Sequence, residues 1–508
     1  MNTPSDSLKK PVVCCISASD SSGHAGHQCD LRVVQDLGTH GVSVISGLTA
    51  QNSRTISQVE ITSAQSFAAQ MSALTDDISI ETVKVGLLLS ADQVEQTAAF
   101  ADSFSGDVIV DPVLASTTGT EFNSAELLNA YPALLASTSL LTPNIPEAEK
   151  LLGTVLNTDE DVIAATIQLR NMGAKAVLLK GGHRGQSPDD RYVYDYFDDG
   201  EHQFWLRQTR LESVNTRGTG CALASAIASF VAQGKPMIDA VVLANAYVHQ
   251  GIHSGFAIGQ GNGLLGNKGW PSEFTYYPAI AASIDGFDQP AFASCDTQAL
   301  GIYPIVDSLE WLERLLALGI KTIQLRVKDI DYNHLDLIIK RAVELGKQYD
   351  ARLFINDYWQ LAIEHQAYGV HLGQEDMDEA QLQEIQQSGL RLGLSSHGEY
   401  EWLRAANFKP SYIAMGSVFP TKTKTVHTIG LDNLKAWSRV LAPHFPLVAI
   451  GGITRQNLKS VVQCGVGSVA VVSAIRTDQH YRQSVEQLQA EFTSGLARAP
   501  VTELPQTP

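Results

Sequence analysis

The sequence lacks the cysteine patterns that mark a zinc site or a disulfide framework. Its six cysteines are scattered and include no CxxC pair; they are Cys14, Cys15, Cys29, Cys221, Cys295 and Cys464. Closely spaced or regularly paired cysteines are what both kinds of site require. Neither is therefore expected, and scattered thiols fit a reducing cytoplasm, where disulfides are rare.

Long apolar runs and an excess of positive charge are missing as well. No run approaches the ~20 apolar residues that span a bilayer, and the start "MNTPSDSLKKPVVCC" has no apolar signal core. The formal net charge is −18 at pH 7, whereas nucleic acids and anionic membranes require a basic patch. We therefore expect a cytoplasmic protein with no nucleic-acid or membrane partner. Small phosphorylated substrates need only a few local donors and are compatible with this charge.

A length of 508 residues predicts two or three domains. In the first half, short β-branched runs such as "VVCCISA", "VSVISGL", "TVKVGLL", "DVIVDPV" and "AVLLKGG" alternate with helical patterns, which predicts an α/β domain with a mainly parallel sheet. Around residues 262–300 the pattern dissolves into Gly, Pro and aromatics. We place a first domain at 11–268, a linker at 269–298, a second domain at 299–492 and a flexible tail at 493–508.

The second half is more regular. Eight strand-like runs begin at "GIYPIVD" (301) and end at "GSVAVVS" (467), with a spacing of roughly 24 residues. Eight evenly spaced βα units favour a closed (β/α)8 barrel over an open doubly wound sheet. Polar residues gather at the carboxyl ends of seven of these runs, where barrel enzymes place their chemistry.

The stretch "NTRGTGC" (215–221) precedes an apolar helical run. Glycines let backbone N–H groups turn inward, and the N-terminus of a helix attracts anions. The pattern predicts a cradle for a phosphoryl group, in which the same field lowers the pKa of the Cys221 thiol. A glycine-rich helix cap followed by a small buried residue is the alternative.

Several spaced motifs over residues 12–265 resemble one kinase family. "TRGTGC" resembles the anion hole of ribokinase-fold kinases, and its cysteine is typical of the hydroxymethylpyrimidine/phosphomethylpyrimidine kinases. "SDSSGHAGHQCDL" (19–31), "TAQNS" (49–53), "VDPV" (110–113), "LTPNIPEAEKL" (141–151) and "LLKGGH" (178–183) continue the match. The resemblance implies a ribokinase-like fold and transfer of phosphate from ATP.

The resemblance also implies a role for each residue of this site. These roles are hydrogen bonding to an aminopyrimidine for Asp30 and Gln51, binding of Mg²⁺, phosphate and ATP for Asn144, Glu147, Lys180 and Thr219, and catalysis for Gly218, Gly220 and Cys221. Each has an ordinary alternative: Gln51 on a turn, Glu147 as a first-turn helix charge, or Lys180 solvated at a strand end.

The chain departs from this family in the loop before its first helix. His24 and His27 stand where Gly and Ile are usual, and Cys29 replaces Ala. "VLASTTGT" (113–120) lacks the lysine common after this strand. Two histidines three residues apart suggest a metal site, but no third ligand is evident.

In the second half, "QLRVK" places Gln324, Arg326 and Lys328 on one face of a strand end, because strand side chains alternate. An amide and two cations suit a diphosphate; a buried ion-pair layer is the alternative. Asp357 and Asp376 follow neighbouring strands and could share Mg²⁺, although Asp376 could instead be a helix N-cap. "FPTKTK" (419–424) and "IGGI" (450–453) suit a second phosphate; a solvated basic loop and a tight turn are their alternatives.

This set of motifs, over about residues 300–490, resembles thiamin-phosphate synthase. The implied ligands of the pyrimidine diphosphate are Gln324, Leu325, Arg326, Val327, Lys328, Asn356, Ser395 and Lys424, those of Mg²⁺ are Asp357 and Asp376, and those of the thiazole phosphate are Thr421, Lys422, Thr423, Gly452, Val472 and Ser473. Val327 replaces the usual Glu and points to the other face. The related thiazole tautomerase barrel tends to lack the full diphosphate and Mg²⁺ set, which favours the synthase.

Together the two resemblances imply a bifunctional enzyme of thiamin biosynthesis. Its expected substrates are small molecules only: hydroxymethylpyrimidine and its phosphates, ATP and thiazole phosphate. We also expect a homo-oligomer. Two alternatives stay open: a pyridoxal-type vitamin kinase in the first half, or a half that binds precursors without catalysis.

Overall fold

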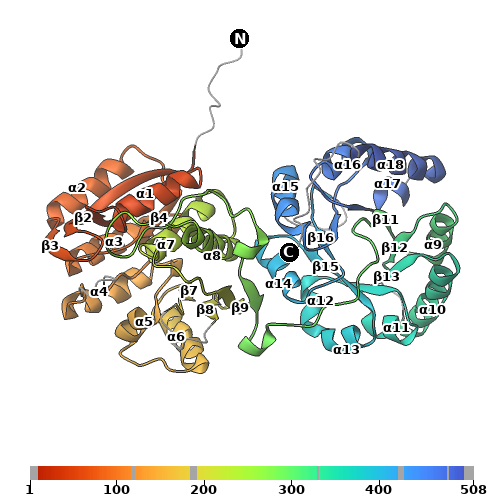
Figure 1. Cartoon of the computed structure of the whole chain (residues 1–508), viewed down its shortest axis with the longest axis horizontal. Helices are drawn as coiled ribbons and strands as arrows, with labels where there is room; N and C mark the ends of the chain where they lie inside the picture. Colours follow the sequence, from red (N-terminus) through yellow and green to blue (C-terminus); the bar gives the residue numbers. More distant parts are fainter. Residues whose placement is uncertain are drawn as a thin grey trace, which may run out of the picture. The chain divides into compact units, whose positions relative to one another are not determined.

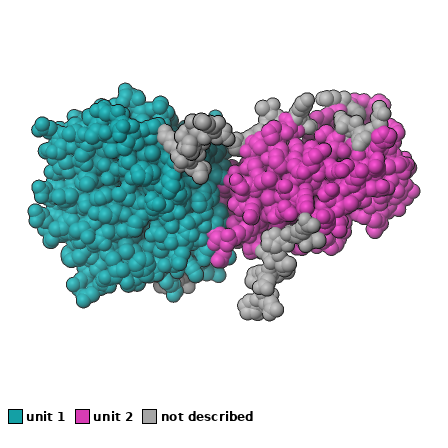
Figure 2. All heavy atoms as spheres, turned by 90° about the horizontal axis from the view of Figure 1, so that it is seen from above, with its two compact units in different colours: residues 1–271, 275–286 teal, residues 272–274, 287–508 magenta. Residues whose placement is uncertain are grey.

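The computed structural model describes residues 10–115, 121–182, 191–328, 331–421, 428–476 and 480–496 (Figure 1). The chain divides into two compact units, one of residues 1–271 and 275–286 and one of residues 272–274 and 287–508 (Figure 2). Among the described residues, no helix combines the length and the apolar character that crossing a membrane requires.

The first unit is built on a ten-stranded sheet. Its strands lie in the order β10 (Ala279–Ala281), β9 (Gln203–Thr209), β8 (Tyr192–Asp198), β7 (Ala176–Leu179), β6 (Leu140–Leu141), β5 (Asp107–Val110), β4 (Thr82–Val85), β1 (Val12–Asp20), β2 (His40–Gln51) and β3 (Ile56–Ile61). Neighbours from β2 to β7 pair in parallel, and the outer strands pair antiparallel. This sheet confirms the predicted α/β fold.

Helices cover both faces of this sheet, so that β1, β4, β5 and β7 are buried almost throughout. One layer contains α1 (Gly26–Asp36), α7 (Thr219–Ala232) and α8 (Met237–His253), with α7 packed on β1, β4 and β5. The remaining helices are α2 (Ala64–Thr75), α3 (Ala91–Ser103), α4 (Ala125–Leu135), α5 (Ile145–Leu152) and α6 (Asp159–Asn171).

The second unit is a closed eight-stranded parallel barrel. Its strands are β11 (Gly301–Val306), β12 (Thr322–Leu325), β13 (Arg352–Asn356), β14 (Gly369–Leu372), β15 (Arg391–Ser396), β16 (Tyr412–Met415), β17 (Leu447–Ala449) and β18 (Ser468–Val471). Because β18 pairs with β11, the barrel is closed and the open-sheet alternative is wrong. Each of the eight strand-like runs found in the sequence overlaps one of these strands.

Ten helices are described in the second unit. They are α9 (Leu309–Leu316), α10 (Tyr332–Gln348), α11 (Trp359–Glu364), α12 (Gln374–Glu379), α13 (Leu382–Gln387), α14 (Glu399–Asn407), α15 (Gly430–Leu441), α16 (Arg455–Val462), α17 (Ser473–Arg476) and α18 (Tyr481–Leu496). The last of them extends a few residues into the segment we expected to be a flexible tail.

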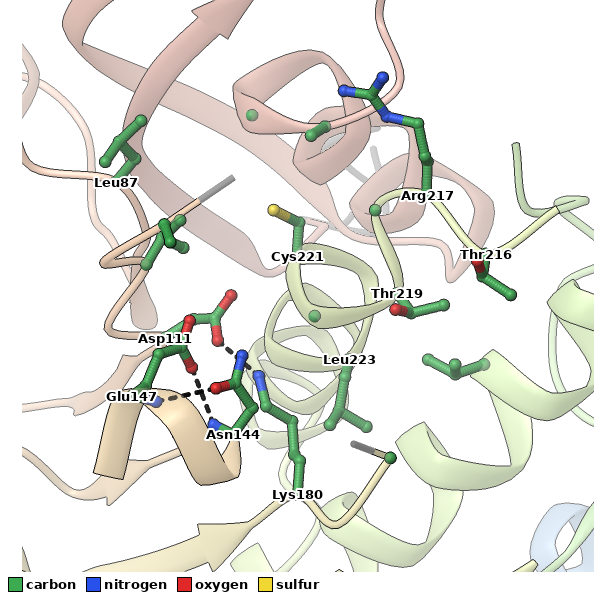
Figure 3. Close-up of a pocket in the computed structure, with 18 of the residues that line it drawn as sticks. Leu87, Asp111, Asn144, Glu147, Lys180, Thr216, Arg217, Thr219, Cys221 and Leu223 are labelled. Carbon is green, nitrogen blue, oxygen red and sulfur yellow. Dashed lines mark hydrogen bonds and ion pairs between the residues drawn. The ribbon is translucent and has the colours of Figure 1, made fainter. Parts of the chain in front are cut away.

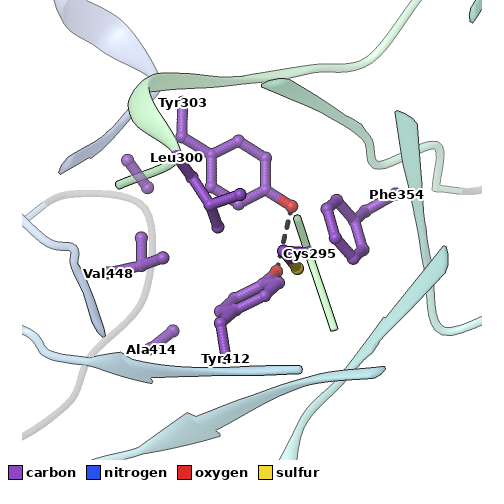
Figure 4. Packing of buried hydrophobic residues seen from close by; sticks show 8 residues of the cluster. Cys295, Leu300, Tyr303, Phe354, Tyr412, Ala414 and Val448 are labelled. Atoms are coloured by element: carbon purple, nitrogen blue, oxygen red, sulfur yellow. Dashed lines mark hydrogen bonds between the residues drawn. The ribbon is translucent and has the colours of Figure 1, made fainter. Parts of the chain in front are cut away.

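The segment 287–298, which we expected to be linker, packs against the N-terminal end of the barrel. Arg391 Nε donates to the carbonyl of Ser294 at 2.9 Å, and Ser411 Oγ donates to that of Ala293 at 2.6 Å. Cys295 is 1% exposed and belongs to the hydrophobic cluster that fills this end of the barrel (Figure 4). The second unit therefore begins near residue 287 rather than at residue 299.

Candidate active sites

The first candidate site is a cavity of about 650 Å³ in the first unit (Figure 3). Residues that follow β5, β6 and β7 line it, as do the start of α7 and the end of β1. The carboxyl ends of parallel strands are where α/β sheets bind their ligands. The structure brings Gln51, Asn144, Glu147, Lys180 and the turn 218–221 together in the lining of this cavity.

The turn at the start of α7 depends on glycine. Gly218 is the N-cap with φ at 79°, a left-handed conformation that glycine adopts at little cost. A Cβ on Gly218 would overlap the carbonyl oxygen of His24, and a Cβ on Gly220 would lie 3.3 Å from both Asp111 Oδ2 and Lys180 Nζ. The N-terminus of α7, which favours anions, thus lies directly against a charged pair.

That pair belongs to a cluster of charged and amide groups. Lys180 Nζ donates to Asp111 Oδ1 at 2.8 Å, and the two side chains are 14% and 3% exposed. Asn144 and Glu147 cap α5 reciprocally, with N–H to oxygen distances of 2.9 and 2.8 Å (Figure 3). Lys180 is therefore an ion-paired residue, and the alternative of a solvated lysine does not fit.

Burial and charge shift the pKa values in this cluster. Burial raises the pKa of Glu147 to about 7; Lys180 opposes this rise and Asp111 adds to it. Burial acts to lower the pKa of Lys180, but Asp111 and Glu147 outweigh it, so that this pKa is raised. A cation between two carboxyl groups, beside a helix N-terminus, suits a phosphate that arrives with a hard divalent ion.

Cys221 lies in the first turn of α7 and lines the cavity. Our expectation that its pKa is lowered is wrong. Burial raises the pKa to about 11, because the thiolate loses its hydration; the Lys84 charge opposes the rise, and Asp30 and Asp111 add to it. The thiol is therefore protonated at neutral pH in this structure.

This pKa can be tested by alkylation. We expect iodoacetamide to modify Cys221 very slowly at pH 8, since only about one thiol in a thousand is then ionised. The rate should keep rising between pH 8 and pH 10, as followed by mass spectrometry of the peptide that contains Cys221. A rate that levels off below pH 8 would contradict the raised pKa.

Asp30 does not line the cavity. Its carboxylate is fully buried between Lys84, whose Nζ lies 2.9 Å from both oxygens, and two serine hydroxyls. Ser17 Oγ donates to it at 2.7 Å and Ser225 Oγ at 2.9 Å. These contacts join β1, β4, α1 and α7 beneath the site. The predicted hydrogen bond from Asp30 to an aminopyrimidine thus has no geometric support, and we do not retain it.

The two unusual histidines precede or begin α1. His24 is 2% exposed, and its Nδ1 shares a hydrogen bond of 2.8 Å with Ser22 Oγ. Within the described residues neither His24 nor His27 belongs to a group of three potential metal ligands. Sequence reasoning missed Asp111 and Arg217, both of which line the cavity. The sequence does contain a clue to both, because Asp111 lies in "VDPV" and Arg217 in "NTRGTGC".

The second candidate site lies at the carboxyl end of the barrel strands. Asp357 follows β13 with φ at 65°, and its N–H donates to the carbonyl of His371 on β14 at 3.0 Å. The pKa of Asp357 is raised to about 6, chiefly by burial and also by Asp376, which hydrogen-bonds it, while Arg326 and Lys328 act to lower this pKa. The two carboxyl groups therefore lie together at one rim, as a shared cation requires.

Asp376 has two contacts. It is the third residue of α12, and its Oδ2 accepts a hydrogen bond of 2.9 Å from the N–H of Gly373. The alternative that Asp376 is the N-cap of this helix is wrong, because Gly373 is the N-cap and Asp376 caps the helix from its first turn. The same carboxyl group also reaches Asp357, so helix capping and a place in the site coexist.

The residues of "QLRVK" span the end of β12. Gln324 is 2% exposed inside the barrel, where it hydrogen-bonds the hydroxyls of Tyr303 and Tyr412. Leu325 and Val327 are buried. Arg326 and Lys328 lie beyond the end of β12, near enough to Asp357 to lower its pKa. The amide is thus deeper in the barrel than the two cations.

The other predicted ligands lie at the ends of their strands. Asn356 ends β13, Ser395 lies near the end of β15, and Val472 and Ser473 follow β18. Gly452 has φ at 61°, and a Cβ on it would come within 2.7 Å of the carbonyl of Pro420, next to Thr421. The loops after β16 and β17 therefore touch. Lys422, Thr423 and Lys424 lie outside the described residues.

Two families match the chain over separate segments. The phosphomethylpyrimidine kinase family matches residues 20–266, and the thiamine monophosphate synthase family matches residues 302–475. These segments hold the cavity and the barrel rim, respectively.

Two relatives agree with this division. A probable chloroplastic thiamine biosynthetic bifunctional enzyme of Oryza sativa subsp. japonica is 34% identical over 92% of this chain and 86% of its own length. The thiamine-phosphate synthase of Yersinia pestis (strain Pestoides F) is 53% identical over 39% of this chain and 93% of its own length. Among solved structures, a pyridoxal kinase from Staphylococcus aureus is 26% identical, with a TM-score of 0.48, and covers 54% of this chain and 98% of its own.

Proposed function

Since the chain belongs to the thiamine biosynthetic bifunctional enzymes, which join a hydroxymethylpyrimidine/phosphomethylpyrimidine kinase to a thiamine-phosphate synthase, we propose how its two sites divide the work. The first unit phosphorylates hydroxymethylpyrimidine and then its monophosphate. The barrel joins the resulting diphosphate to thiazole phosphate and releases pyrophosphate. ATP is the phosphate donor, and Mg²⁺ is the proposed metal at both sites.

In the kinase site, Gln51 binds the aminopyrimidine, because an amide both donates and accepts hydrogen bonds. Lys180 and the N-terminal turn of α7 receive the negative charge of the transferring phosphoryl group. Cys221 orients the attacking hydroxyl as a neutral thiol. A strong base is not required, since phosphoryl transfer passes through a loose transition state with little bond formation to the attacking oxygen. The close approach of Gly220 to the Lys180–Asp111 pair is the observation that supports this proposal.

In the synthase site, Arg326 and Lys328 bind the diphosphate and stabilise it as it departs. The amino group of the pyrimidine supplies electrons to the methylene cation that remains, and the thiazole nitrogen captures this cation. The other proposed diphosphate ligands are Gln324, Asn356, Ser395 and Lys424, and those of the thiazole phosphate are Thr421, Lys422, Thr423, Gly452, Val472 and Ser473. The contact of Asp357 with Asp376, flanked by two cations, supports this proposal.

The groups at both sites suit Mg²⁺. Asp357 and Asp376 offer oxygen ligands at one point of the rim. Burial and the neighbouring Asp376 both disfavour the ionised form of Asp357, and a bound cation would stabilise that form. Glu147 and Asn144 offer oxygen atoms in the kinase site. When bound, Mg²⁺ neutralises charge on the phosphate oxygens.

An assay of thiamin phosphate formation by the whole chain tests this proposal. Given hydroxymethylpyrimidine, ATP, Mg²⁺ and thiazole phosphate, it should form thiamin phosphate, and each omission should abolish the product. Hydroxymethylpyrimidine diphosphate should replace the pyrimidine and ATP together. Faster phosphorylation of pyridoxine than of hydroxymethylpyrimidine would contradict the kinase assignment, and product from neither route would contradict the synthase assignment.

Binding of Mg²⁺ to the barrel should depend on pH. Below its raised pKa of about 6, Asp357 carries a proton that the metal must displace. We expect Mg²⁺ affinity to increase from pH 5 to pH 7 by about tenfold and to change little above this. Calorimetric titration of Mg²⁺ and diphosphate into the protein measures it. An affinity that is constant over this range would contradict the assignment of Asp357.

We also propose a cytoplasmic location and a homo-oligomer. All six cysteines are free thiols, which supports a reducing compartment. Leu48 on β2 and Ile61 on the edge strand β3 are 53% and 51% exposed. Apolar side chains beside an open sheet edge favour a second copy as partner. Cell fractionation and light scattering test the two statements.

A further inference from the structure

A chain of hydrogen bonds runs through the inside of the barrel to its active rim. The hydroxyls of Tyr303 on β11 and Tyr412 on β16 lie 2.9 Å apart (Figure 4). The Tyr412 hydroxyl lies 2.8 Å from His371 Nδ1, and His371 Nε2 lies 2.9 Å from Ser395 Oγ. Both tyrosines are almost fully buried and His371 is 9% exposed, so this series of hydrogen bonds is shielded from water as far as Ser395.

His371 is connected to two groups of the proposed diphosphate and Mg²⁺ site. Its imidazole is hydrogen-bonded to Ser395, and its backbone carbonyl accepts a hydrogen bond of 3.0 Å from the N–H of Asp357. Ser395 is held from a second direction, because Gln374 Nε2 donates to its carbonyl at 2.6 Å. The imidazole also stacks on the Tyr412 ring, with an angle of 13° between the planes. The ring therefore has one orientation, fixed by packing and by both of its nitrogens.

We propose that His371 is a positioning residue of the synthase, which orients the Ser395 hydroxyl toward the pyrimidine diphosphate. The proposal rests on the role proposed for Ser395. An imidazole whose two nitrogens both make hydrogen bonds, one as donor and one as acceptor, fixes the direction of each. When Tyr412 donates to Nδ1, Nε2–H donates to Ser395 Oγ, and the hydroxyl proton of Ser395 is free for a phosphate oxygen.

The side chains of asparagine and glutamine separate the two bonds of His371. The amide of asparagine lies near the position of Nδ1 and can keep the bond to Tyr412 while it loses Ser395. The amide of glutamine reaches the position of Nε2 and can keep Ser395 while it loses Tyr412. A histidine that serves only to fill the barrel should tolerate both changes to a similar degree, whereas a positioning role makes them unequal.

The experiment measures thiamin phosphate formation by the whole chain against the concentration of pyrimidine diphosphate, with saturating thiazole phosphate. We expect H371N and S395A each to lower kcat/KM by about tenfold or more, and H371Q by about threefold or less. The double variant H371N/S395A should be no more than about twofold worse than S395A, since residues that act through one bond are not additive. Kinase activity of the first unit, measured in the same samples, should be unchanged.

Additive losses in the double variant would overturn the proposal, as would equal losses for H371N and H371Q. Where H371N unfolds the barrel, Y412F gives the same test by removing only a hydroxyl: it should lower kcat/KM in the wild-type background and have little effect in S395A. Losses by Y412F that are equal in both backgrounds would also overturn it. A wild-type chain that forms no thiamin phosphate would refute the proposed function instead.

Discussion

The variant D357N is expected to lower thiamin phosphate formation by about a thousandfold and to leave the kinase unchanged. The substitution keeps the shape of the side chain and removes one negative charge from the point where Asp357 meets Asp376. Loss of a metal clamp on a departing diphosphate costs several kcal/mol of transition-state stabilisation, and about 4 kcal/mol corresponds to this factor.

The same variant, D357N, should be at least as stable as the wild-type protein, although its activity is lower. The pKa of Asp357 in the folded protein is about 6, above its ordinary value of 3.8, so the ionised form destabilises the fold at pH 7 without metal. D357N removes this cost, and the metal-free barrel should unfold at the same or a higher temperature. Lower activity with undiminished Tm would exclude misfolding as the cause.

A matched control lies on α12, the helix that contains Asp376. Asp378 in α12 is 69% exposed on the surface, where it pairs with Arg404, and exposed pairs of this kind contribute little. D378N should therefore retain nearly full synthase activity. The assignment of Asp357 would be wrong if D357N kept more than about a tenth of the wild-type rate at saturating Mg²⁺.

The barrel could be predicted from sequence because its strands are buried in a regular series. Runs such as "RLFIN" and "SYIAMG" are short, apolar and evenly spaced, and each contains an observed strand. The antiparallel strands β8 and β9 in the first unit were not predicted. Their sequences, "YVYDYFD" and "QFWLRQT", mix aromatics with polar residues, and burial changes along each strand instead of alternating between its two faces.

Other features depend on contacts between distant residues. The segment 287–298 forms no helix or strand, so its sequence has no periodic pattern. It is held instead by arginine side chains from β13 and β15 that donate hydrogen bonds to its carbonyls. The pKa of Cys221 depends on its burial, which its place at a helix start does not reveal. Asp30 is turned away from the cavity by Lys84, which lies 54 residues further along the chain.

Substitution of Gly218 is expected to have a large effect on the kinase. G218A is expected to lower kinase kcat/KM by at least about a hundredfold, since displacement of a site by 1 Å can cost this much. The new Cβ would overlap the carbonyl of His24, so either the loop before α1 or the first turn of α7 must move. Both Cys221 and Gly220, on which a Cβ would lie 3.3 Å from the Lys180–Asp111 pair, belong to that turn.

A variant of Gly234, just beyond the other end of α7, serves as a control that has the backbone strain of G218A without the overlap. Its φ is 85°, close to the 79° of Gly218, but a Cβ there meets nothing within 4 Å. G234A should therefore cost about 1 kcal/mol of stability, as left-handed alanine does elsewhere, and leave the kinase intact. Because the two variants share the strain, the difference between their kinase rates reports the geometry of the turn alone. Rates within about threefold of each other would mean that the start of α7 does not bind the transferring phosphoryl group.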